Sequence, residues 1–218
     1  MTGSEQGFLL LTGYLGDTRR KLLTVAQFRE LTRRAQKMEK PRENRELTVT
    51  DLLELGCDKA FAERVLCLLS QKEQLNWYLE KGKKANCIPV TRISKDYPAE
   101  INKALGLDAP GVIWAKGDLA LLNEPMIALV GSRNLRDENR EFAYEVGKQA
   151  AMQGYTLVSG NARGADLVGQ RSCLAHGGKV ISVVADSLQA QPLQENVLYL
   201  SEQGFDLPFS SLRALQRN

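Results

Sequence analysis

Two short turns rich in glycine and arginine hold the residues best suited to chemistry in this sequence. The first, Gly131-Ser132-Arg133, ends the apolar run 126–130, and the second, from Ser159 to Asp166, ends the apolar run 155–158. One helix-length segment separates them, which predicts two parallel strands joined by a helix. Ligands of such sheets bind at the carboxyl ends of the strands, where glycines let the backbone come close.

Each turn contains one arginine, Arg133 in the first and Arg163 in the second. Two guanidinium groups at one sheet edge repel each other unless an anion lies between them. The expected ligand is therefore an anion that carries several phosphates. Arg163 could instead pair with Asp166 or point into solvent. Asp166 follows Gly164, where we expect its carboxylate to cap the next helix.

Known catalytic patterns are missing from the sequence. Neither turn matches the GxxxxGK[ST] phosphate loop or the GxGxxG dinucleotide motif, and there is no HExxH or GxSxG. The one histidine, His176, stands beside two glycines at a predicted helix end, where a structural role is expected. We therefore predict a binding protein rather than an enzyme, with no cofactor and no bound metal.

Composition sets further bounds on the class of protein. The chain has 218 residues, 43% of them hydrophobic and 25% charged, which is typical of a soluble globular protein. No apolar run approaches the roughly 20 residues that span a membrane, and no signal peptide is evident.

Four cysteines without CxxC spacing favour reduced thiols and a cytoplasmic protein. The net charge of +3 is small, but the first 98 residues contain 18 Lys/Arg against 13 Asp/Glu.

Residues 1–86 are predicted to form a small helical domain of the SAM or helix-hairpin-helix kind. Thr24 can cap one helix, and Thr50 or Asp51 can cap another. The tract Leu52–Gly56 has a weak likeness to a helix-hairpin-helix DNA-binding turn, but simple helix packing explains it better.

Residues 87–218 are predicted to form an α/β domain with a Rossmann-like parallel sheet. Apolar runs alternate with helical patterns, and this order implies parallel strands with right-handed crossovers. We expect strands at 111–115, 126–131, 155–159 and 179–185, with helices near 137–153 and 165–176.

From about Ile88 onward, the chain resembles the DNA-processing protein A (DprA/Smf) family. Several blocks match in order and spacing, and the segment that contains them covers roughly 60% of the chain. They are Ser94-Lys-Asp-Tyr-Pro98, Ala109–Gly117, Ile127–Arg133, Val158–Asp166 and the final Pro208–Asn218, which looks like the start of the family's Phe…Arg-Asn-Arg motif.

The resemblance implies a cytoplasmic protein that binds single-stranded DNA and loads the RecA recombinase during transformation or recombination. It also implies a homodimer with no membrane contact. Stacking plus guanidinium contacts suit sequence-tolerant single-strand binding. The residues that the resemblance assigns to the DNA site are Gly131, Ser132 and Arg133 on one wall, Ser159, Gly160, Arg163 and Gly164 on the other, and Phe209 and Arg217 from the last motif.

The sequence departs from the family pattern at a few positions. Gln170 stands where the family usually has histidine, and Ser187-Leu-Gln189 replaces its Gly-Leu-Asp. The chain also stops inside the Arg-Asn-Arg motif, so we expect a sheet that is truncated at its C-terminal end.

The alternative interpretation is a nucleotide-binding or nucleotide-hydrolysing enzyme of the lysine-decarboxylase-like Rossmann superfold. Those enzymes use similar Gly/Arg loops. They also need a PGGxGTxxE-like turn with a catalytic glutamate, and this sequence contains no such run.

Overall fold

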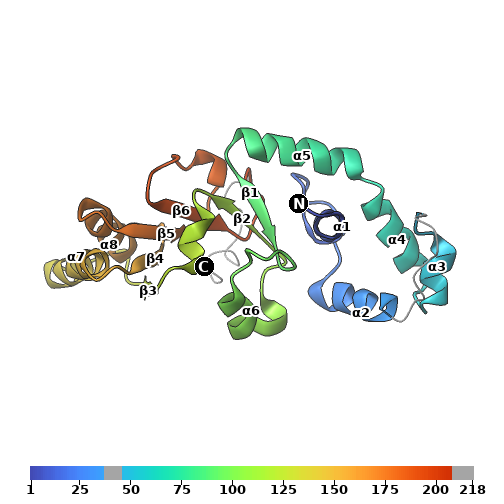
Figure 1. The fold of residues 1–218 in the computed structure, drawn as a ribbon, viewed down its shortest axis with the longest axis horizontal. Helices are drawn as coiled ribbons and strands as arrows, with labels where there is room; N and C mark the ends of the chain where they lie inside the picture. The colour runs from blue at the N-terminus through green and yellow to red at the C-terminus, as the bar shows by residue number, and fades with distance from the viewer. Residues whose placement is uncertain (37–45, 208–218) are drawn as a thin grey trace. The chain divides into compact units, whose positions relative to one another are not determined.

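The computed structural model describes residues 1–36 and 46–207 (Figure 1). These residues divide into two compact units. The helical unit combines Met1–Glu80 with Thr91–Val112, and the sheet unit combines Lys81–Val90 with the chain from Ile113 onward. The predicted division at residues 86/87 therefore differs from the packing, because 91–112 pack with the helices.

Each of the first three helices begins with a capping box, in which a threonine and the residue three positions later bond each other's backbone N–H. Thr24 starts its helix as predicted. The predicted cap Thr50 or Asp51 is wrong, because Thr48 is the cap and Asp51 is its box partner. The helices are α1 (Gly3–Thr12), α2 (Val25–Ala35), α3 (Val49–Glu54), α4 (Lys59–Leu69) and α5 (Lys72–Lys84).

Apolar side chains from separate helices form the core of the helical unit. Leu11, Leu52 and Val65 lie in one cluster and are almost completely buried. The 91–112 segment adds α6 (Ala99–Leu105) and the 3-10 turn η1 (Gly106–Asp108). The hydroxyl of Tyr97 donates to the Pro110 carbonyl at 2.6 Å, which closes this segment on itself.

The described sheet has six strands in the order β1-β2-β6-β5-β4-β3. The four strands β3 to β6 run parallel, whereas β2 is antiparallel to β6, so the sheet is mixed. The α/β class with a preceding helical part is confirmed. The strands are β1 (Ile88–Thr91), β2 (Val112–Lys116), β3 (Met126–Leu129), β4 (Thr156–Gly160), β5 (Lys179–Val183) and β6 (Val197–Ser201).

Two helices form the crossovers between the parallel strands, α7 (Asp137–Met152) and α8 (Ala165–Ala175). They lie side by side next to β3, β4 and β5 (Figure 1). A Cβ added at Gly147 of α7 would lie 2.1 Å from the carbonyl oxygen of Gly169 of α8. Glycine at this position therefore allows the close helix packing. The 3-10 turns η2 (Leu119–Asn123) and η3 (Leu188–Ala190) complete the unit.

Among residues 1–36 and 46–207, none of the helices combines the length and the apolar character that a membrane crossing requires.

Candidate functional site

The parallel register of β3 and β4 brings the two predicted turns to the same edge of the sheet. Leu129 lies opposite Ser159, so both strands end at the same level. The buried Ser159 hydroxyl donates to the Leu129 carbonyl at 2.7 Å and ties the strand ends together. The β3–β4 register therefore brings the two turns together at the carboxyl ends of the strands, where the sequence predicted them to meet.

Glycines allow the two turns to touch. Gly164 has φ +99°, and a Cβ added there would lie 2.2 Å from the Ser132 carbonyl oxygen. A Cβ at Gly131 would lie 2.6 Å from the Cβ of Ala165. The Ala165 amide donates to the Ser132 carbonyl at 3.1 Å. The first backbone N–H of α8 is therefore occupied by this hydrogen bond and cannot donate to an anion. An anion at this edge would depend on side-chain donors more than the sequence predicted.

Both arginines of the turns are exposed to solvent. Arg163 Nη2 donates to the amide oxygen of Asn134 at 2.9 Å, and this neutral partner does not cancel its charge. Within the described part of the chain, neither Arg133 nor Arg163 forms an ion pair, which excludes the alternative pairing of Arg163 with Asp166. The turns therefore present two uncompensated positive charges.

Asn134 is a site residue that the sequence reasoning missed. It lies two residues after Ser132, whose hydroxyl accepts from the Asn134 amide at 3.1 Å and donates to its carbonyl at 2.8 Å. This local Ser/Asn turn fixes the side-chain amide that holds Arg163. The Ser-x-Asn spacing was the available signal, because serine and asparagine favour such turns.

The predicted helix-cap role of Asp166 is wrong. Gly164 is the N-cap of α8 and provides no side chain for capping. Asp166 lies two residues further on, is 7% exposed and accepts from the Ala162 amide at 3.4 Å. A Cβ at Gly160 would lie 2.5 Å from its carboxylate oxygen. Asp166 therefore supports the loop from beneath, because a residue inside the first turn faces back toward that loop.

Gln170 occupies a buried position below the same loop. Its side-chain amide donates to the Gly160 carbonyl and, at 3.2 Å, to the hydroxyl of Ser182 in β5. Both partners are neutral oxygen atoms, so a neutral amide donor satisfies them. Although the family usually has histidine here, Gln170 keeps this part of the loop hydrogen-bonded.

A second connection joins the loop to the chain after β5. The Asn161 side chain donates to the Gln191 side-chain oxygen at 3.2 Å. Gln191 follows shortly after Ser187-Leu-Gln189, one of the places where the sequence departs from the family pattern. The two remaining predicted site residues, Phe209 and Arg217, lie outside the described residues.

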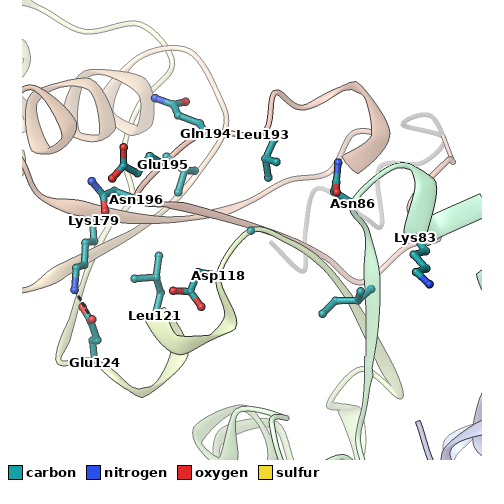
Figure 2. Close-up of a pocket in the computed structure, with 13 residues that line it drawn as sticks. Lys83, Asn86, Asp118, Leu121, Glu124, Lys179, Leu193, Gln194, Glu195 and Asn196 are labelled. Atoms are coloured by element: carbon teal, nitrogen blue, oxygen red, sulfur yellow. Dashed lines mark hydrogen bonds and ion pairs between the residues drawn. The ribbon is translucent and has the colours of Figure 1, made fainter.

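A separate cavity of about 880 Å³ lies near the amino ends of β5 and β6, and neither turn lines it (Figure 2). Lys179, at the start of β5, forms an ion pair there with Glu124. Hydrogen bonds from Lys179 and then Thr156 lower the pKa of the Glu124 carboxyl. Asp118 and Glu195 also line this cavity, so its charge suits a polyanion less well than the turns do.

Metal ligands are not gathered in the described residues. Within ranges 1–36 and 46–207, no three side chains of the His, Cys, Asp or Glu types are placed to hold a metal ion.

The fold and the turns define a Rossmann-like α/β protein with a helical unit and a basic site at the carboxyl edge of its sheet. Residues 89–210 match the family model for DNA recombination-mediator protein A. The match spans more than half of the chain, and the chain therefore belongs to that family.

Individual relatives agree with this assignment. The chain is 32% identical over 121 residues to the DNA processing protein DprA of Bacillus subtilis, covering 55% of this chain and 39% of that protein. It is 34% identical over 92 residues to DprA of Streptococcus pneumoniae, covering 42% of this chain and 32% of that protein. The residues matched in sequence thus span well under half the length of these relatives.

The fold is similar to a solved structure over most of the chain. The crystal structure of DprA from Streptococcus pneumoniae superposes with a TM-score of 0.60 and 24% sequence identity, covering 95% of this chain and 70% of that chain. This similarity includes the helical part as well as the sheet.

Proposed function

We propose that this chain binds single-stranded DNA at the two turns that meet beside Gly164. The observation that supports this most directly is the pair of exposed arginines, Arg133 and Arg163, without a carboxylate partner among the described residues. A single strand offers a run of phosphates with rotatable linkages. Guanidinium groups bind phosphates with charge-assisted, often bidentate hydrogen bonds.

We assign the two walls of the site to the two turns. Gly131, Ser132 and Arg133 form the first wall, and Ser159, Gly160, Arg163 and Gly164 form the second. The glycines let a DNA backbone approach, and the arginines provide the charge. Phe209 and Arg217 remain predictions for the same site, the first for packing or stacking and the second for a phosphate contact.

The biological role that we propose follows from the family. Membership supports a function in DNA processing and recombination. We propose further that the protein acts in the cytosol as a homodimer and helps to load RecA during transformation or recombination. The sheet unit would supply the DNA-binding domain, and the helical unit would be a separate domain. No catalytic step is needed for this role, so we propose a binding protein without enzyme activity.

The test is DNA binding by site variants, measured as the fluorescence anisotropy of a labelled oligothymidylate of about 20 nucleotides. Arg133→Ala and Arg163→Ala should each weaken binding about tenfold or more, because a hydrogen bond to a charged group contributes roughly 1.5–3 kcal/mol. Arg171→Ala is the matched control, since Arg171 is an exposed arginine further along α8. Site variants that keep the melting temperature and bind like the parent protein would contradict the proposal.

A further inference from the structure

The helical unit contains a groove that the proposed DNA site does not use. It has a volume of about 790 Å³ and lies between α1, α2 and the 91–112 segment. This volume falls within the roughly 300–1,000 Å³ that is usual for small-ligand sites. It can hold a short segment of chain but not a folded domain.

The floor of the groove is apolar and preformed. Phe8 and Leu23 are buried, and the half-exposed Ile93 lines the same groove. The ring of Phe8 contacts that of Phe28 edge to face, with centroids 4.6 Å apart. Each ring therefore covers part of the other, and the remaining apolar lining is aliphatic.

Among the residues that the structure describes, the charged side chains that line the groove are all arginines, and none is a carboxylate. Arg33 is already paired with Glu30 at 2.7 Å. Arg92 donates to the Gly106 carbonyl, a neutral partner. Arg29 is exposed and forms no ion pair or hydrogen bond with any residue that the structure describes. Arg29 and Arg92 therefore leave two positive charges beside an apolar floor.

We propose that this groove binds an acidic peptide segment with an apolar anchor, supplied by a partner protein. The apolar side chain of the peptide would lie on the floor between Phe28 and Ile93. Neighbouring carboxylates would bind Arg29 and Arg92, since the planar guanidinium matches carboxylate geometry. Anchors of this kind in a water-excluding pocket provide most of the affinity in protein recognition.

A nucleic acid fits this groove less well than a peptide does. Base binding to single strands depends on aromatic faces on which bases stack. Phe8 is buried, and Phe28 is the one other aromatic ring among the described lining residues, so successive bases would find at most one ring on which to stack. The helical unit would therefore bind a protein, while the turns of the sheet unit remain available for DNA.

The probe for the test is a fluorescein-labelled synthetic peptide of four aspartates followed by Leu-Phe, added to the full chain. Two control peptides separate the contributions, one with asparagine in place of aspartate and one that ends in Ser-Ser. We expect the fluorescence anisotropy of the acidic peptide to rise and saturate as the protein concentration increases. Each control peptide should bind about tenfold more weakly.

Protein variants locate the binding site. Arg29→Glu and Ile93→Ser, both at exposed positions, should each weaken peptide binding about tenfold. Arg19→Glu is the matched control, because Arg19 is an exposed arginine of the same unit that pairs with Asp17 outside the groove. Oligothymidylate binding should be unchanged in all three variants.

The remaining outcomes would overturn the proposal. It fails if the unaltered protein does not bind the acidic peptide, or if Arg29→Glu and Ile93→Ser bind it like the Arg19→Glu control. If Arg29→Glu loses oligothymidylate affinity as much as peptide affinity, the groove is a nucleic-acid contact instead. Loss of DNA binding in the turn variants alone leaves this inference intact, so the two proposals can fail separately.

Discussion

Gly164 packs against Ser132 so closely that a Cβ on Gly164 would lie 2.2 Å from the Ser132 carbonyl oxygen. The two residues belong to turns that are about thirty positions apart in the sequence. Their contact joins the two loops into one edge, and the exposed arginines belong to that edge. The position of each guanidinium group therefore depends on the other turn as well as on its own.

This contact predicts that Gly164→Ala damages the site more than the charge changes do. The added Cβ would force the turns apart and place alanine at φ +99°, a strain of roughly 1–3 kcal/mol before the clash is counted. We expect a lower melting temperature and a loss of oligothymidylate binding.

Gly177→Ala is the matched control for that substitution. Gly177 has φ +74°, but a Cβ there meets no atom within 4 Å. It therefore reports the cost of the backbone conformation alone. Equal effects of the two substitutions on DNA binding would show that the contact between the turns is unimportant.

Binding should depend on salt and should favour single strands over duplexes of equal length. Each phosphate neutralised on a single strand contributes a slope of about −0.7 to the plot of log affinity against log salt concentration. The double variant Arg133→Ala/Arg163→Ala should therefore flatten the slope by about 1.4. A titration series from low to high sodium chloride measures this, and an unchanged slope would mean that the arginines do not contact phosphates.

The helical unit should lose one stabilising interaction in acid. Hydrogen bonds from Arg33 and then Arg34 lower the pKa of Glu30 from 4.5 to about 2. A carboxyl whose pKa is lower in the folded state stabilises that state above pH 4.5 and loses the effect as the pH falls through about 2. The stability difference between the parent protein and Glu30→Gln should therefore shrink over this interval. Urea unfolding at successive pH values tests it, and a constant difference would contradict the assignment.

We expect no hydrolysis of nucleotides or DNA at the turns. Asp166 is buried beneath the loop, and Gln170 cannot transfer protons at neutral pH. A rate enhancement of about 10⁶ requires about 8 kcal/mol of transition-state stabilisation, and phosphate binding alone stabilises ground and transition states alike. Prolonged incubation with ATP, AMP and labelled single-stranded DNA, with and without Mg²⁺, provides the measurement. Turnover that disappears in Asp166→Asn would favour the nucleotide-hydrolase alternative.

Local sequence patterns determined the strands and turns of the site. The apolar runs that end at Gly131 and Ser159 predicted two strands with one helix between them, and the β3–β4 pairing agrees. Thr24 as a helix cap is equally local. These features depend on backbone preferences and on burial of one run of residues, and a sequence displays both directly.

Tertiary packing decided what the side chains at the site do. Asp166 supports the loop instead of capping α8, and Asn134 rather than a carboxylate holds Arg163. Residues 91–112 pack with the helices although they follow the first strand. Each of these outcomes depends on atoms that lie close in space but belong to different segments. Sequence spacing fixes which residues share an edge, and only the packed structure fixes which atoms meet there.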